Sequence, residues 1–149
     1  MARSNRTLTQ FAVEKLHQFS ESDRQETFIE KKGNTTCSVK FSPVKEEFVF
    51  RVCLFDKLIF EASERCVSVF SGDFYDSKGR PSRTTRERLN GLLDAVGELG
   101  WTPKGVRAFL FDDGEESTCC IGKGEVCGVL DSKHPDRIIA RNPEQLLVF

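Results

Sequence analysis

Arginine and threonine side chains crowd a short polar stretch of this 149-residue chain, just before a helix-like apolar pattern. Guanidinium groups, hydroxyls and the unpaired amides at a helix start all donate hydrogen bonds to phosphate or carboxylate groups. Phe74 and Tyr75, in the loop that precedes them, carry rings that stack on a nucleobase or pack on a partner. The stretch therefore predicts a site for an anionic group. The candidate binding residues are Tyr75, Arg80, Arg83, Thr84, Thr85, Arg86 and Arg88.

The same residues also have a purely structural interpretation. Thr84 would then do no more than cap the helix. The arginines would form a solvated face whose charge is balanced by nearby carboxylates, namely Asp73, Asp76 and Glu87. Both interpretations fit the residue types, and the sequence leaves the choice open.

A helix over about residues 84–97 positions these side chains. Thr84-Thr85-Arg86-Glu87 fits the Ser/Thr-x-x-Glu capping box, with Thr84 as the N-cap. Apolar residues then recur at the i, i+3, i+4 and i+7 spacing of one helix face. They are Leu89, Leu92, Leu93 and Val96. Gly97 or Gly100 is expected to end the helix.

Patterning upstream predicts a second helix and several strands. Apolar residues at helical spacing follow a Thr7–Gln10 capping box and predict a helix from about Leu8 to Phe19. Gly33-Asn34 separates two β-prone runs, which predicts a hairpin. Three strands are expected next, and the segment 48–55 is apolar enough for a central strand covered on both faces.

Downstream of the predicted helix, β-prone runs at about 105–111, 117–121 and 126–130 are separated by turn residues. The C-terminal tail that follows these runs is expected to pack on the domain as an irregular segment or as a short terminal helix. Short connections between the early strands favour an antiparallel meander over a crossover sheet. We therefore expect one α+β domain over residues 1–149. It would be an antiparallel meander sheet with the helix at about 84–97 packed across one face, joined by the N-terminal helix.

Part of this pattern resembles a known group of small domains. A hairpin precedes a Gly-x-x-Tyr step at Gly72 and Tyr75, and Ser-x-Thr-Thr-x-x-Arg-Leu-Asn opens the helix. The matching helix residues are Ser82, Thr84, Thr85, Arg88, Leu89 and Asn90. Over roughly half of the chain, this resembles domains of unknown function encoded by phages and plasmids, although the DSKGRP loop departs from their tighter spacing. The resemblance implies an accessory protein of a mobile element and supplies no mechanism.

Charge is unevenly distributed along a chain whose formal net charge is −1. Residues 78–107 hold seven basic and three acidic side chains, whereas residues 108–149 hold four basic and eight acidic ones. The whole molecule therefore has no basic field that would draw it onto nucleic acid. Its polarity does allow self-association, with a basic part against an acidic part.

The six cysteines are expected to stay reduced, because we expect a cytoplasmic protein. No apolar run approaches the roughly 20 residues of a membrane helix, and the start lacks the apolar segment of a secretory signal. A membrane is therefore not among the expected partners. Cys53 and Cys66 lie in apolar strand-like runs, and the cysteines lack the usual zinc-ligand spacing. We expect core cysteines, no metal and no cofactor.

An acidic turn over residues 112–116 supports a rival hypothesis, a small divalent-metal-dependent nuclease or hydrolase. The next strand lacks a carboxylate-x-Lys step, and Gly122-Lys123-Gly124 lacks the frame of a phosphate loop. His17 and His134 leave few ways to build a nucleophile–base pair. We therefore predict no catalytic residues.

The sequence thus favours a non-enzymatic binding or accessory protein that contacts an anionic partner through its basic loop and helix start. The expected partner is nucleic acid or an acidic protein surface, including that of a host defence complex. The metal-dependent enzyme and a protein-interaction or self-associating module remain the alternatives.

Overall fold

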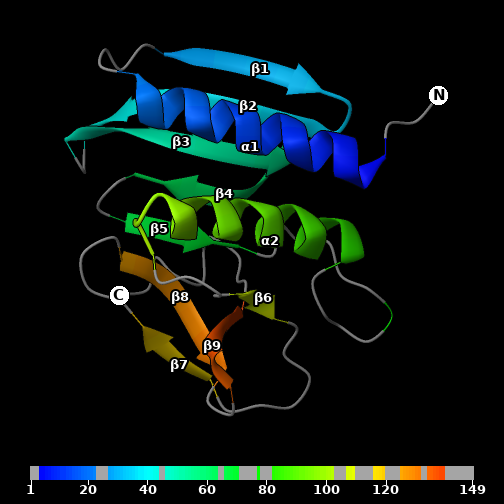
Figure 1. Ribbon diagram of the computed structural model, residues 1–149, viewed down its shortest axis with the longest axis vertical. Helices are drawn as coiled ribbons and strands as arrows, with labels where there is room; N and C mark the ends of the chain where they lie inside the picture. Colours follow the sequence, from blue (N-terminus) through cyan, green and yellow to red (C-terminus); the bar gives the residue numbers. More distant parts are fainter. Residues whose placement is uncertain are drawn as a thin grey trace.

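The computed structural model describes residues 4–22, 27–43, 46–63, 66–70, 77, 82–102, 107–109, 116–119, 125–131 and 134–139, the last four segments by their backbone alone. Two helices and nine strands lie in these segments (Figure 1). They are α1 (Asn5–Glu21), β1 (Phe28–Lys32), β2 (Thr35–Ser42), β3 (Glu47–Leu54), β4 (Lys57–Ala62), β5 (Cys66–Val69), α2 (Arg83–Glu98), β6 (Arg107–Phe109), β7 (Glu116–Cys119), β8 (Glu125–Asp131) and β9 (His134–Ile139).

Strands β1 to β5 pair antiparallel in chain order, which confirms the predicted α+β fold and its meander. The sheet continues in the order β5-β8-β9-β6, and β7 pairs with β8. Because the chain leaves β5 through α2 instead of a hairpin, β8 joins β5 in parallel. The tail prediction was wrong over residues 134–139, which form strand β9 and not an irregular cover or a helix.

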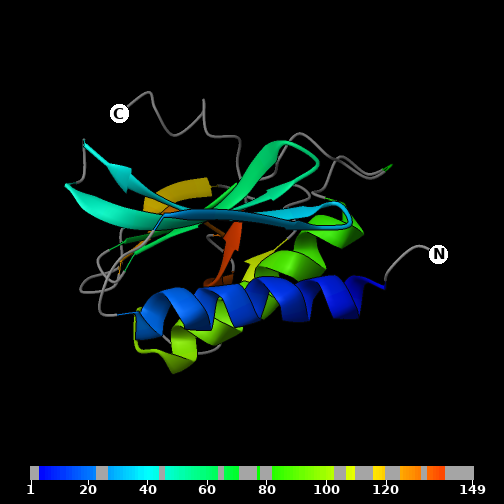
Figure 2. The same ribbon diagram turned by 90° about the horizontal axis from the view of Figure 1, so that it is seen from above.

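Helices α1 and α2 lie side by side on one face of the sheet and run in the same direction (Figures 1 and 2). The apolar stripe of α2 is buried as predicted, and α1 buries a matching stripe. Together with inward-facing strand residues, they form one hydrophobic core. Gly91 allows the close approach of the helices, because a methyl group there would collide with the Thr9 side chain.

The two N-caps lie earlier than the sequence predicted. Ser4 caps α1, and Ser82 caps α2 by accepting a hydrogen bond from the Thr85 amide at 3.2 Å. The capping box at Thr84 was therefore wrong. The Glu87 carboxylate instead accepts a hydrogen bond from the side chain of Arg83, at 2.8 Å from Nε.

The C-terminal end of α2 is a Schellman motif. Gly100 has a φ of 78°, and its amide donates to Gly97 O at 3.1 Å. The Trp101 amide donates to Val96 O at 2.9 Å. Of the two predicted end residues, Gly100 is the one that terminates the helix, since its left-handed backbone disfavours a side chain.

Strand β3 is central, between β2 and β4, and its burial alternates. Phe50, Val52 and Leu54 belong to the core under the helices. On the other face Val49 is buried, whereas Arg51 and Cys53 are half-buried. The sequence predicted that both faces of this strand are covered. On the face away from the helices, only Val49 is fully buried.

The turn between β3 and β4 carries backbone strain. Its central residues are Phe55 and Asp56, with φ of 50° and 144°. Primed two-residue turns require positive φ and prefer Asn-Gly, because a Cβ in the left-handed region costs roughly 1–2 kcal/mol per residue. The β1–β2 turn avoids this cost, since Gly33 occupies its first central position with a φ of 59°.

Candidate functional site

Both helices begin at the same end of the molecule, beside the β1–β2 and β3–β4 turns (Figure 1). The Asn5 side-chain amide donates to Thr84 Oγ1 at 3.5 Å, which joins the two helix starts. The Phe55 amide donates to Asn34 O at 2.8 Å, which joins the two turns. Four chain segments that are distant in sequence therefore meet here.

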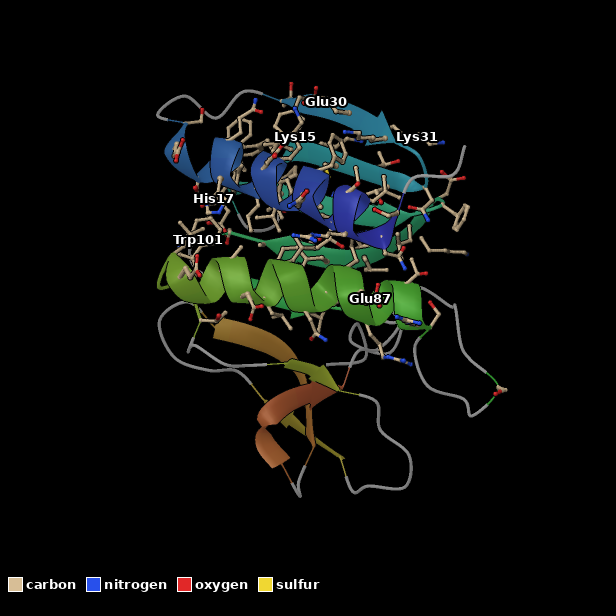
Figure 3. All side chains as sticks on the ribbon, turned by 45° about the vertical axis from the view of Figure 1, so that its right-hand side comes forward. Lys15, His17, Glu30, Lys31, Glu87 and Trp101 are labelled. Atoms are coloured by element: carbon tan, nitrogen blue, oxygen red, sulfur yellow. The ribbon has the colours of Figure 1, made fainter. Side chains whose placement is uncertain are left out.

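We call this region the basic end. Its described residues include seven basic and two acidic side chains. The basic ones are Arg6, Lys31, Lys32, Lys57, Arg83, Arg86 and Arg88, and the acidic ones are Asp56 and Glu87. Figure 3 shows Lys31 on β1 and Glu87 on α2 toward this same end. The excess of positive charge creates a positive local potential, which the helix N-termini reinforce.

Arg88 is the buried centre of the basic end. Its side chain is fully buried, and it donates to Asn5 O at 2.9 Å, to Thr9 Oγ1 at 2.7 Å and to Asn34 Oδ1 at 3.3 Å. These contacts tie α2 to the start of α1 and to the β1–β2 turn. Burial lowers the pKa of the guanidinium, and its Nε has no hydrogen-bond partner. Its acceptors are neutral oxygens, so Arg88 holds the segments together from inside the fold.

The remaining candidates from the helix start divide by exposure. Arg83 is the most open, with 82% of its side chain exposed, and its hydrogen bond lowers the pKa of the Glu87 carboxyl. Arg86 is half-buried. Thr85 is fully buried, and its hydroxyl lies 2.9 Å from Ser82 Oγ, so it belongs to the cap. Tyr75 and Arg80 lie outside the described residues.

Sequence reasoning missed half of this surface. It singled out the arginines of α2 but not those basic residues that other segments supply. These are Arg6 from α1, Lys31 and Lys32 before the β1–β2 turn, and Lys57 after the β3–β4 turn. The lysines beside the predicted Gly33-Asn34 turn were visible as a local signal. Their approach to α2 was not, because it depends on the parallel packing of the helices.

The opposite end of the helix layer has the reverse character. Its described carboxylates lie at both helix ends and at the β2–β3 turn: Glu21, Glu46, Glu47, Asp94 and Glu98. Aromatic rings join the elements there. Phe19 stacks near Phe50 at 6.0 Å and meets Trp101 edge-on at 6.1 Å between centroids. Figure 3 shows Trp101 and His17 at this end. We call it the acidic end.

The two cysteines with described side chains are free thiols on opposite faces of the sheet. Cys37 pairs with Val52 in register, so Cys53, the next residue, points the other way. Burial raises the pKa of Cys37 to about 12, and burial also raises the pKa of Cys53. These thiols therefore hold their protons at neutral pH, as expected of cysteines packed in a sheet.

Among the described residues, no group of three histidine, cysteine or acidic side chains is placed to hold a metal ion. The acidic turn at 112–116 lies outside the described residues, apart from the backbone of Glu116 in β7. Within the described part of the chain, neither helix is long and apolar enough to cross a membrane.

No family model, curated protein or solved structure matches this chain. Functional inference therefore rests on the geometry and charge of the basic end.

Proposed function

We propose that this protein is a non-enzymatic binding protein that contacts an anionic partner through its basic end. The observation that carries the proposal is the placement of charge on the helices. Neither helix has an acidic residue in its first turn or a basic one in its last turn. Arg6, Arg83 and Arg86 instead lie beside the positive ends of the helix dipoles.

This placement is unfavourable for folding. A cation at a helix N-terminus costs roughly 0.3–1 kcal/mol at an exposed position, because it repels the helix dipole. The Arg83–Glu87 pair also has its basic residue N-terminal to the acidic one, which is the weaker order for an i,i+4 pair. The helix dipole disfavours arginines in this position, and a partner whose negative charge they bind would explain their presence.

Several groups at the basic end would bind an anion at the same time. Arginine forms paired, charge-assisted hydrogen bonds to phosphate or carboxylate, and the helix dipoles add to the attraction. A positive end on a molecule with an acidic opposite end would also orient the protein during diffusional encounter. The partner is nucleic acid or an acidic protein surface. The resemblance to phage and plasmid domains favours an accessory protein of a mobile element, with a host defence complex as one setting.

Charge reversals at the two ends test the proposal. Retention on phosphocellulose is measured for Arg83→Glu and for Lys40→Glu, an exposed position on β2 away from the helix starts. Both variants change net charge equally. Arg83→Glu should elute at clearly lower salt while its thermal stability stays close to wild type, because the gain of a carboxylate in the first helix turn offsets its repulsion from Glu87. Lys40→Glu should elute close to wild type. Equal shifts for both variants would show that net charge alone, and not the basic end, controls binding.

A further inference from the structure

The β3–β4 turn carries an exposed aromatic ring. Phe55 is 59% exposed and has a positive φ, so it neither fills the core nor suits the backbone of its turn. Asparagine or glycine would relieve the strain in such a turn. Strained residues with exposed side chains are found disproportionately at binding surfaces, where a ligand makes use of the side chain.

Phe55 also belongs to the basic end. Its amide donates to Asn34 O, and the side chain of Asn34 accepts a hydrogen bond from Arg88. Lys57 follows two residues later at the start of β4. An exposed ring is thus fixed, through one shared turn residue, to a surface rich in lysine and arginine.

We propose that the basic end binds single-stranded nucleic acid, with a base stacked on Phe55 and phosphates held by the surrounding cations. The inference rests on the proposed function and names its partner. Stacking platforms combined with basic grooves are the chemistry that single strands require, because their bases are free and their backbone is charged. In a duplex the bases already stack on each other, so they have little stacking energy to gain from the Phe55 ring. An acidic protein surface would use the cations but would not need a ring held in a strained turn.

The test measures fluorescence anisotropy of a labelled oligodeoxythymidine of about 16 nucleotides, a length within the site sizes of single-strand binders. A duplex of the same length and poly-L-glutamate serve as competitors. Three variants are compared with wild type. Phe55→Asn removes the ring and suits the left-handed turn, Phe55→Tyr keeps the ring, and Arg83→Glu reverses one charge of the basic end.

Wild type should bind the single strand more tightly than either competitor. Phe55→Asn should raise the Kd about 5- to 150-fold, equivalent to roughly 1–3 kcal/mol for one stacked base, while the melting temperature rises. Phe55→Tyr should stay within about twofold, since stacking tolerates a hydroxyl. Loss of binding together with a gain in stability is a result that a purely structural role for Phe55 would not produce.

Other outcomes separate this inference from the proposed function. If Phe55→Asn binds as wild type while Arg83→Glu weakens binding, the basic end binds anions without stacking, and only this inference fails. Preference for the duplex or for poly-L-glutamate would also overturn it alone. If Arg83→Glu changes binding of none of the three probes, the proposed function fails as well.

Discussion

The two ends of the helix layer are built from different chemistry. At the basic end, α1 and α2 are joined by hydrogen bonds from a buried arginine to neutral oxygens. At the acidic end, they are joined by the rings of Phe19 and Trp101, with Phe50 beneath. Aromatic packing stabilises a fold without desolvating charge, whereas a buried cation without a carboxylate partner is expensive. The helices are thus held together by apolar packing at one end and by a desolvated charge at the other.

The two ends of the helix layer also differ in surface charge. Arginines lie at the helix starts, and carboxylates such as Asp94 and Glu98 lie near the end of α2. Both placements oppose the helix dipole, so the two ends polarise the molecule more strongly than folding requires. The acidic end, with its packed rings, should therefore dominate stability, and the basic end should dominate binding and its sensitivity to salt.

The largest predicted effect on stability is at the acidic end. Phe19→Ala should lower the free energy of unfolding by about 3–5 kcal/mol, because it removes a buried ring from between Phe50 and Trp101. Urea unfolding followed by circular dichroism measures the change. Trp101, the only tryptophan, reports locally on this end by fluorescence. At low temperature the folded fraction should still be retained on phosphocellulose. A loss below about 1 kcal/mol would contradict the role assigned to these rings.

At the basic end, Arg88→Ala should cost about 3 kcal/mol, since it removes the hydrogen bonds that tie α2 to Asn5 and Thr9 of α1 and opens a cavity at a fully buried position. Arg83→Ala on the same helix is the matched control and should stay within about 0.5 kcal/mol, as expected of an exposed residue. Urea denaturation of both variants gives the comparison. If the two variants lose equal stability, Arg88 does not hold the basic end together.

The last prediction concerns alkaline pH only, where stability should be lost through Cys37. Its folded pKa is raised from 9.0 to about 12, so the unfolded thiol ionises first. The contribution is complete below pH 9.0 and is lost as the pH rises toward 12. Over that window this thiol should lower stability by about 1.4 kcal/mol per pH unit. Urea midpoints at several alkaline pH values should therefore fall less steeply for Cys37→Ala than for wild type, and identical slopes would refute the assignment.

Local patterns in the sequence predicted the elements well. The Leu89 stripe, the hairpin at Gly33-Asn34 and the meander of β1 to β5 followed from spacing and turn residues, because these signals act over a few residues. The caps were less predictable. Ser82 and Thr84 both offer a hydroxyl within one turn, and only the structure shows that Ser82 Oγ is the one that accepts a helix amide, from Thr85.

The candidate site was predictable only in part. Arg83 and Arg86 were identified from a run of basic residues at a helix start, and the structure leaves them at its surface. Arg88 looked identical in sequence, yet it is fully buried, because its position on α2 faces α1. Phe55 was assigned to a strand and gave no sign of function. Its exposure and positive φ appear only once the register of β3 and β4 is known.

The sequence by itself determined the two helices, the early strands and the polar character of α2, since each depends on periodicity or turn chemistry within a short segment. Only the tertiary structure decided that both helix starts and two turns meet at one end. Helix direction and sheet order bring together Arg6, Phe55 and Arg83, which no local spacing relates. A surface assembled from distant segments is a property of packing, and packing decides which of several similar arginines is buried and which can bind a partner.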